Sequence, residues 1–376
     1  MDVGKSSCAD VVTKPPSLTF AEPLRMPFSI ALAPFHLRFK HPFGTAHGVR
    51  TGTDSVFVRV SSGPHVGYGE ATLPPYVKET QASVLARLRS FEKEEVRSND
   101  LISFFAWLDA DLAFGKAPAA RSAISMAFID LVSRRSATPV EDLLGVSQLS
   151  KPKSMATIGL CEPHEVAEKL DELPAMPVLK IKLGGSHDLA VLKEVIDLTD
   201  RRIFLDANQG LSSVSDALTL IRQAGGAERV FGMEQPFSVD RPDLTADLAR
   251  RTPVTVYADE SVQTLRDLDR AVGIFGGVNV KLMKCGGLDR ALQVIHRARE
   301  IGMRVMLGSM SESSLGCGAM ARLSGMADLC DLDGPWLLAN DPFTGFDWGE
   351  NGFKWKEGPG LGIVPAVQLP FDPIGA

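Results

Sequence analysis

Residues 176–210 read MPVLKIKLGGSHDLAVLKEVIDLTDRRIFLDANQG, and this stretch decides the fold. It holds two apolar runs of strand length, at residues 178–183 and 203–206. Between them, residues 188–199 carry apolar side chains at helical spacing. The stretch therefore predicts a strand–helix–strand unit, and repetition of such units builds a parallel sheet.

The same unit recurs along the chain after Lys151. Short apolar runs that end in polar or small residues lie at 156–160, 178–183, 203–206, 230–234, 255–259, 278–282, 304–309 and 329–333. Amphipathic segments separate them, for example at 163–173, 213–224 and 288–301. Eight such units are what a closed β/α barrel requires, whereas an open doubly wound sheet usually has fewer strands and a glycine-rich first turn. We favour the barrel, although irregular Gly- and Pro-rich sequence replaces the eighth helix.

The first part of the chain has a different sequence pattern. Phe57, Val58 and Val60 lie in a β-rich run, and residues 61–64 (Ser-Ser-Gly-Pro) turn the chain into a second run at 65–70. Helical stretches follow at 78–95, 101–114 and 119–134. These patterns predict a small α+β domain. We expect a loose extension over 1–27, the α+β domain over 28–150, the barrel over 151–340, and a segment over 341–376 that returns to the first domain.

Composition narrows the function classes. Hydrophobic residues make up 44% and charged residues 23% of the 376, as in an ordinary soluble globular protein. The 40 Lys and Arg against 46 Asp and Glu give a net charge of −6, so no global basic field exists to attract nucleic acid or an anionic membrane. Small-molecule chemistry is the better starting hypothesis.

The five cysteines form no CxxC pair and no short Cys/His cluster, which argues against a zinc finger or a disulfide framework. The first 28 residues contain no apolar run of signal-peptide length, and nowhere do about 18 apolar residues follow one another. We therefore expect a soluble, cytoplasmic protein. Its oligomeric state stays open, although barrel enzymes often form homo-oligomers.

Polar side chains stand at the carboxyl ends of the predicted strands, where the active sites of β/α barrels lie. They are Lys180 and Lys182 on strand two, Asp206 on three, Glu234 on four, Asp259 and Glu260 on five, Asn279 and Lys281 on six, and Asp331 and Asp333 on eight. Residues two apart on a strand share a face, so the two lysines of strand two converge, as do the two aspartates of strand eight.

Three of these carboxylates, Asp206, Glu234 and Asp259, are hard oxygen ligands of the kind that hold Mg²⁺. Zinc is less suited, because no His or Cys accompanies them. Taken singly, a Lys-x-Lys pair is more often a solvated strand end and a lone Asp more often a cap or turn residue. The order of base, three carboxylates and second base on consecutive strands favours function.

This arrangement predicts proton abstraction next to a carboxylate. The enolate dianion so formed must be stabilised. One preorganised electrostatic contact stabilises such a developing charge by roughly 3 to 4 kcal/mol. Mg²⁺ and Lys180 are the expected contacts. Strands two and six lie across a barrel from each other, so Lys182 and Lys281 are expected to flank the carbon from opposite faces. One takes the proton and the other returns it. We expect the nearby cations to lower the pKa of the base.

At these residues the sequence resembles the enolase superfamily, specifically its muconate-lactonising subgroup and, within that, the dipeptide epimerases. The resemblance runs over most of the chain and is carried by LKIK (179–182), DANQG (206–210), EQP (234–236), ADES (258–261), NVKLMK (279–284), GSMSES (308–313) and DLDG (331–334). It implies an α/β fold, a modified (β/α)₇β TIM-like barrel with an N-terminal α+β capping domain. It also implies an isomerase with one Mg²⁺ per subunit.

The resemblance further assigns the substrate. The Asp331-x-Asp333 pair looks like the dipeptide epimerase pattern, in which two carboxylates hold the free α-ammonium of the dipeptide. Thr157 and Ser309 match positions that line the substrate in this family. L-Ala-D/L-Glu is the family's default substrate, in recycling of cell-wall peptides or in general peptide catabolism.

The second residue of the dipeptide is less defined. In enzymes that act on Ala-Glu, a capping-domain loop can supply an Arg to the glutamate side chain, and the matching position here is Gly48. Arg50, Lys40 or His47 could substitute, or the pocket could accept an apolar side chain. Two other functions stay open: racemisation of N-succinylamino acids or o-succinylbenzoate synthesis, and a non-catalytic descendant that binds ligands.

Overall fold

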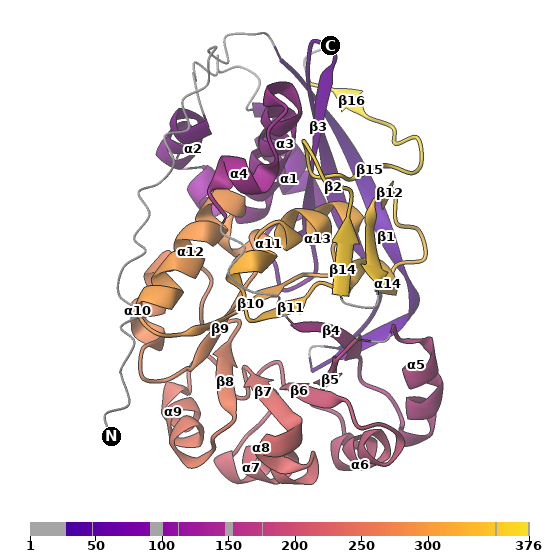
Figure 1. The fold of residues 1–376 in the computed structure, drawn as a ribbon, viewed down its shortest axis with the longest axis vertical. Coiled ribbons are helices and arrows are strands. Elements are labelled where there is room, and N and C mark those ends of the chain that lie inside the picture. The colour runs from indigo at the N-terminus through magenta and orange to yellow at the C-terminus, as the bar shows by residue number, and fades with distance from the viewer. Residues whose placement is uncertain are drawn as a thin grey trace, which may run out of the picture.

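The computed structural model describes residues 28–46, 48–90, 101–111, 113–146, 153–174, 176–349 and 352–374. The expected N-terminal extension, residues 1–27, and His47 therefore lie outside the described residues. Within these ranges the chain forms an antiparallel sheet with helices and, beside it, a closed barrel (Figure 1).

The antiparallel sheet opens the described chain. β1 (Ser29–Thr45), β2 (Gly48–Ser62) and β3 (His65–Leu73) pair in sequence order, and the short β16 (Asp372–Pro373) joins the free edge of β1. The predicted hairpin is confirmed, because Ser62 lies opposite His65. Gly63, in the turn between them, has a φ of 57°, a conformation that glycine adopts without steric cost.

Helices cover one face of this sheet. They are α1 (Gln81–Ser90), α2 (Leu101–Ala110), the longer α3 (Pro118–Ser136) and α4 (Val140–Leu144). α3 lies directly on β3, because a Cβ at Gly69 would stand only 1.9 Å from the carbonyl oxygen of Ala123. α3 also contacts the barrel through α11 (Leu282–Cys285). It is therefore buried on all sides rather than along one apolar stripe.

Eight parallel strands close into a barrel, as predicted. They are β4 (Lys153–Ile158), β5 (Val178–Lys182), β6 (Arg202–Asp206), β7 (Val230–Glu234), β8 (Thr255–Ala258), β9 (Gly277–Val280), β10 (Arg304–Gly308) and β11 (Leu329–Asp331). Neighbours in the chain are neighbours in the barrel, and β11 pairs with β4 to close it.

A helix follows each of the first seven barrel strands. These are α5 (Val166–Glu172), α6 (Asp188–Leu198), α7 (Val214–Gln223), α9 (Pro242–Arg251), α10 (Leu268–Ala271), α12 (Leu288–Glu300) and α13 (Ser314–Ala321), with the short α8 (Gly226–Arg229) after α7. In the described residues after β11, the only helix is the four-residue α14 (Gly334–Leu337). The fold is therefore a modified (β/α)₇β barrel with an N-terminal α+β capping domain, as the sequence predicts.

Several strand limits differ from the prediction by one to three residues, and the pairing and capping of the chain explain two of them. The first strand begins at Lys153 rather than at 156, because its start is set by pairing with Leu329 of β11 and not by apolar side chains. The sixth strand ends at Val280 rather than at 282, because Lys281 caps α11. Gly286, with a φ of 95°, ends that helical turn.

The chain after α14 returns to the capping sheet. β12 (Phe343–Thr344) pairs with β15 (Val364–Pro365), and β13 (Phe346–Gly349) with β14 (Gly352–Trp355). The ring of Phe343 lies 5.0 Å from that of Phe57 and 5.7 Å from that of Tyr68. The proposed domain limits stay a prediction. In the described part of the chain, no helix combines the length and the apolar character needed to cross a bilayer.

Candidate active site

An apolar layer inside the barrel supports the polar residues above it. The layer consists of Met155, Val178, Phe204, Tyr257, Met306 and Leu329, all fully buried. Gly277 makes room for the ring of Tyr257, since a Cβ there would stand 2.4 Å from the ring carbon Cε1. Side chains two residues further along a strand point the same way. At that register stand Thr157, Lys180, Asp206, Glu234, Asp259, Asn279 and Asp331.

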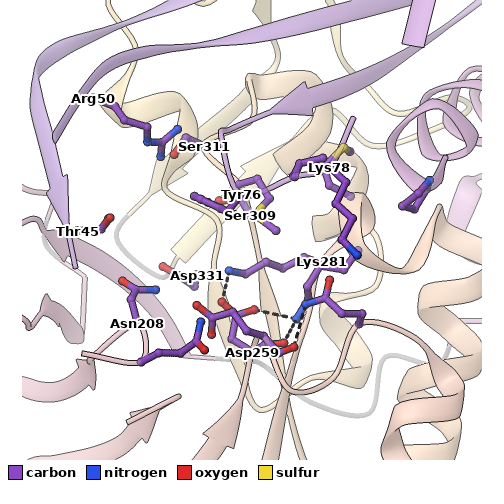
Figure 2. Close-up of a pocket in the computed structure, with 18 of the residues that line it drawn as sticks. Thr45, Arg50, Tyr76, Lys78, Asn208, Asp259, Lys281, Ser309, Ser311 and Asp331 are labelled. Carbon is purple, nitrogen blue, oxygen red and sulfur yellow. Dashed lines mark hydrogen bonds and ion pairs between the residues drawn. The ribbon is translucent and has the colours of Figure 1, made fainter. Parts of the chain in front are cut away.

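A cavity of about 610 Å³ lies over this polar layer. Its floor includes Lys180, Asp259 and Lys281, and its other walls include the capping-domain residues Arg50 and Tyr76 (Figure 2). The cavity therefore lies between the carboxyl ends of the barrel strands and the capping domain, where a β/α barrel places its chemistry.

The Lys180 ammonium joins three carboxylates in the floor. Its Nζ lies 2.9 Å from Asp206 Oδ2, 2.7 Å from Glu234 Oε2 and 2.6 Å from Asp331 Oδ2. Burial by itself would lower the pKa of Lys180, but the charges of these carboxylates outweigh burial and hold the pKa well above its ordinary value. Lys180 is thus a permanent buried cation.

Glu234 has fewer partners than its neighbours. Oε1 accepts a hydrogen bond of 2.7 Å from Asn279 Nδ2, whereas buried Oε2 has no well-directed donor among the described residues, its contact with Lys180 being an ion pair. Burial, and then the charge of Asp206, raise the pKa of Glu234 to about 7. For Asp206 the cations Lys180 and Lys182 outweigh burial and hold the pKa below its ordinary value. Of the three predicted Mg²⁺ ligands, Glu234 therefore has the fewest ammonium groups on its carboxylate.

Asp259 is divided between two lysines. Lys281 Nζ lies 2.8 Å from Oδ2, and Lys284 Nζ lies 2.8 Å from Oδ1. Burial would raise the pKa of Asp259, but these two ammonium groups outweigh it and hold the pKa below its ordinary value. Asp259 is therefore ionised throughout the neutral range.

These carboxylates suit a hard divalent cation. Asp206, Glu234 and Asp259 offer oxygen donors without a soft ligand, the set that Mg²⁺ prefers, and Glu234 Oε2 is buried without a directed donor. As the described side chains stand, no three acidic, His or Cys residues form a ready coordination shell. Ammonium groups lie on the oxygens instead. The donor chemistry and the burial fit Mg²⁺, and the predicted ligand set stays a prediction.

Lys182 and Lys281 come from opposite sides of the barrel. Three strands separate β5 from β9 in either direction around the closed ring. Lys182 Nζ lies 2.6 Å from Asp206 Oδ2 and 3.0 Å from Asn208 Oδ1, and Lys281 Nζ lies on Asp259. Both amines line the cavity.

The pKa of Lys281 is set by burial and by the neighbouring carboxylates. Burial favours the neutral amine, but the charges of Asp259 and Glu234 outweigh burial and hold the pKa of Lys281 above its ordinary value. The physical reason is proximity, because the Asp259 carboxylate touches the ammonium directly. The expected fall of this pKa, which was attributed to Lys180 and a bound Mg²⁺ together, stays a prediction.

The strand-eight aspartates meet at Thr157. The Thr157 backbone N–H donates a 2.6 Å hydrogen bond to Asp333 Oδ2, and its hydroxyl lies 3.4 Å from Asp331 Oδ1. Burial, and then the charge of Asp331, raise the pKa of Asp333 to about 6. Both aspartates line the cavity, as does Ser309 at the end of β10. With Lys180, which was also predicted to bind substrate, the structure brings all five predicted substrate-binding residues to one cavity.

Of the predicted specificity residues, Arg50 lines the cavity. Its guanidinium lies 5.3 Å from the Phe39 ring centre and 5.6 Å from that of Tyr76, and its Nη1 is buried without a hydrogen-bond partner among the described residues. Figure 2 shows Arg50 on the side of the cavity remote from Asp259. Lys40 points elsewhere, over the Trp336 ring at 4.6 Å.

Two residues of this site carried no role in the sequence interpretation. Gln235 Oε1 accepts hydrogen bonds of 3.1 Å from the N–H groups of Asp259 and Ser261, and Lys284 Nζ donates to Asp259 Oδ1. Gln235 has a φ of 33°, unusual for a residue with a side chain. Both stand in motifs that had been noted, but only the folded chain shows what they contact.

The sequence matches two family descriptions over most of its length. Residues 29–145 match "Mandelate racemase / muconate lactonizing enzyme, N-terminal domain", and residues 164–368 match "Enolase C-terminal domain-like". The first range covers the capping sheet with its helices, and the second covers the barrel after β4 together with most of the C-terminal segment.

Individual proteins are similar over nearly the whole chain. The L-Ala-D/L-Glu epimerase of Bacteroides thetaiotaomicron is 33% identical over 336 residues, which cover 88% of this chain and 86% of that protein. The L-Ala-D/L-amino acid epimerase of a Maribacter species is 32% identical over 329 residues, 86% of this chain and 95% of the other. The crystal structure of the dipeptide epimerase from Enterococcus faecalis V583, complexed with Mg and L-Leu-L-Tyr, is 27% identical. It superposes with a TM-score of 0.79 and covers 89% of this chain and 98% of that one.

Proposed function

The chain belongs to the enolase superfamily, in its mandelate racemase / muconate lactonizing enzyme family, and on that premise we propose that it is a Mg²⁺-dependent dipeptide epimerase. It inverts the α-carbon of the C-terminal residue by two-base 1,1-proton transfer. One observation carries the proposal: Lys182 and Lys281 enter one cavity from opposite strands, with the buried carboxylates Asp206, Glu234 and Asp259 between them.

The two lysines divide the proton transfer. One amine removes the α-proton from one face of the carbon, the electron pair passes into the carboxylate as an enolate, and the other ammonium returns a proton to the opposite face. A bound Mg²⁺, held by Asp206, Glu234 and Asp259, supplies Lewis-acid stabilisation of that negative charge. Lys180 adds a preorganised cation, because its pKa keeps it charged.

Asp331 and Asp333 bind the α-ammonium of the first residue. Two aspartates on one side of the cavity face a single side-chain cation, Lys180, on Asp331. Asp333 receives a backbone N–H and no side-chain cation among the described residues. A substrate ammonium supplies the missing positive charge, and Thr157 and Ser309 line its surroundings.

The default substrate is L-Ala-D/L-Glu or a related dipeptide. The support is Arg50, whose buried Nη1 offers an unused donor to a side-chain carboxylate, and Lys78 and Lys116, which also line the cavity. Arg50 stands two residues from Gly48, the position that matches the arginine of Ala-Glu enzymes. The other substitute proposed from the sequence, His47, lies outside the described residues. An apolar second side chain is the alternative, with the aliphatic part of Arg50 and the Tyr76 ring as its wall.

The structure gives less support to N-succinylamino acid racemisation and o-succinylbenzoate synthesis, because such substrates carry no ammonium for Asp331 and Asp333. These two reactions would be favoured if the protein acts on their substrates and keeps that activity in the Asp331→Asn and Asp333→Asn variants.

The deciding experiment is incubation of a dipeptide panel with Mg²⁺ in D₂O, read by NMR and chiral chromatography. We expect deuterium at the α-carbon of the C-terminal residue together with inversion. Absence of exchange with every dipeptide would overturn the proposal, and a Lys182→Met/Lys281→Met double variant controls for contaminating isomerases.

We also propose that the protein is cytoplasmic and forms a homo-oligomer, with no nucleic-acid or membrane partner. The free thiols of Cys161, Cys285, Cys317 and Cys330 fit a reducing compartment. Light scattering coupled to size-exclusion chromatography tests the oligomer directly.

A further inference from the structure

Lys284 is a buried lysine that the proposed reaction does not use. Its Nζ donates to three acceptors: Asp259 Oδ1 at 2.8 Å, the Asp259 carbonyl oxygen at 2.8 Å and the Asn279 carbonyl oxygen at 2.7 Å. The residue is 5% exposed. All three ammonium protons are therefore assigned, which leaves no donor for a substrate.

The lysine stands in a rigid element. It lies in the helical turn α11, which begins directly after Lys281, so both lysines that touch Asp259 belong to one turn. The capping domain holds the far end of this turn, because Arg121 of α3 donates a 2.7 Å hydrogen bond to the Gly286 carbonyl oxygen and pairs with Asp289 at 2.7 Å. The backbone that carries both lysines is therefore anchored to the capping domain.

The consequence for Asp259 is that its two carboxylate oxygens differ. Oδ1 and the backbone carbonyl are held by Lys284, and the backbone N–H is held by Gln235 Oε1 at 3.1 Å. Oδ2 faces Lys281, which lines the cavity. Of the two carboxylate oxygens of Asp259, only Oδ2 is therefore turned toward the groups that line the cavity.

We propose that Lys284 is a positioning residue: it fixes Asp259 with Oδ2 toward the cavity and sets the Lys281 amine at one face of the substrate carbon. The inference rests on the proposed function for the role of Lys281, but its effect on Asp259 is independent of which substrate is used. Groups that orient a metal ligand from behind typically change metal affinity 10- to 100-fold when removed.

The test compares Lys284→Met and Lys284→Gln, which both remove the ammonium, with Lys284→Arg, which keeps the charge and the donors. Mn²⁺ affinity is measured by electron paramagnetic resonance in the substrate-free protein. We expect weakening by about 10- to 100-fold in Lys284→Met and recovery of part of that loss in Lys284→Arg. Lys193→Met on α6 is the matched control, because that lysine is exposed and pairs only with Asp197 among the described residues.

A second readout separates positioning from a general structural role. Deuterium exchange is measured for each epimer of the dipeptide, because Lys182 and Lys281 serve opposite faces of the carbon. A misplaced Lys281 slows exchange of one epimer at least tenfold more than the other, whereas a loosened fold slows both alike. If Lys284→Met does not fold, Lys284→Gln and Lys284→Arg carry the same comparison.

Wild-type Mn²⁺ affinity in a folded Lys284→Met or Lys284→Gln variant would overturn the proposal. So would equal slowing of the two epimers. If no dipeptide exchanges with the wild-type protein, the proposed function fails by itself, while the Mn²⁺ comparison still decides whether Lys284 positions Asp259.

Discussion

Two groups of buried carboxylates lie near the same cavity and are neutralised in different ways. The catalytic layer (Lys180, Lys182, Asp206, Glu234, Asp259 and Lys281) pairs its acids with ammonium groups. The cap–barrel joint (Glu70, Thr72, Glu312, Ser313 and Gly316) surrounds its acids with neutral donors. There, Glu70 of β3 accepts hydrogen bonds from Ser313 N at 3.0 Å, Ser313 Oγ at 2.6 Å, Gly316 N at 2.9 Å and Thr72 Oγ1 at 2.7 Å.

The difference follows from what each region must do. An ammonium on a carboxylate can exchange its partner for a substrate or a cation, so the catalytic layer keeps charges that can be redistributed. Backbone N–H groups are fixed by the start of α13 and cannot move away from Glu70. The joint therefore holds the capping domain on the barrel, and the catalytic layer carries the chemistry.

The largest predicted effect is in the catalytic layer. Lys281→Met and Lys182→Met remove one proton carrier each, and general acid–base groups contribute typically 10²- to 10⁴-fold. We expect the rate of epimerisation to fall by about 10³-fold or more in both variants. The melting temperature should change by no more than a few degrees. Each variant should retain α-proton exchange of only one epimer, measured by NMR in D₂O. Exchange of both epimers by either single variant would break the assignment of one base to each face.

The next effect separates the joint from the layer. Glu70→Gln keeps the shape but replaces an acceptor of several hydrogen bonds by an amide. Hydrogen bonds to a charged group are worth about 1.5 to 3 kcal/mol. We expect the free energy of unfolding to fall by about 3 kcal/mol in urea titrations, while Mn²⁺ affinity of the folded protein stays within about twofold. A large loss of Mn²⁺ affinity without loss of stability would contradict the division between the two regions.

The same division explains what could be predicted from the sequence. The catalytic layer was predictable because each of its members ends a strand, and the barrel turns equal positions on successive strands into neighbours. Lys180 and Asp206 needed no knowledge of side-chain packing. The joint could not be found in this way, because Glu70 and Ser313 are 243 positions apart and belong to different domains. Their contact exists only once the capping sheet has docked on α13.

Lys284 lies between these cases. Its spacing of three from Lys281 was visible, but a helical turn after the sixth strand was not, since the apolar run suggested that the strand continued to 282. The direct contact between Lys281 and Asp259 was not predictable for a related reason. The sequence gives the list of nearby charges but not their distances, and direct contact with Asp259 outweighs the cations further away.

A smaller effect concerns Arg50, a cation that lines the cavity and belongs to neither group. Arg50→Met removes a guanidinium whose Nη1 has no hydrogen-bond partner among the described residues, so the folded protein should lose little stability. For L-Ala-L-Glu we expect kcat/KM to fall by about 10- to 100-fold, the size of a charge-assisted hydrogen bond of roughly 1.5 to 3 kcal/mol. For L-Ala-L-Leu it should not fall. Both values of kcat/KM are measured by coupled chiral assays. An equal fall for the two dipeptides would mean that Arg50 does not select an acidic second residue.

The smallest effect is a pH dependence of the joint. Burial, and then the charge of Glu70, raise the pKa of Glu312 to about 8, with Lys281 opposing weakly and the Cys317 thiol beside the Glu312 backbone carbonyl. Since the unfolded chain has an ordinary carboxyl pKa near 4.3, the folded state binds an extra proton between about pH 4.5 and 8. Stability from this group is thus present at low pH and is lost as pH rises through that window, by at most about 1.4 kcal/mol per pH unit.

Glu312→Gln removes this titration while keeping the shape of the side chain. The variant should therefore gain stability relative to the wild type as pH rises from 5 to 8, in urea unfolding measured at each pH. Glu228→Gln, at an exposed acid outside the joint, should show no such trend. A difference between Glu312→Gln and wild type that stays constant with pH would mean that Glu312 is ionised in the folded protein throughout. The neutral donors of the joint would then stabilise two adjacent carboxylates, those of Glu70 and Glu312. In that case the joint would hold buried charges, as the catalytic layer does, although no ammonium group of the described residues is paired with them.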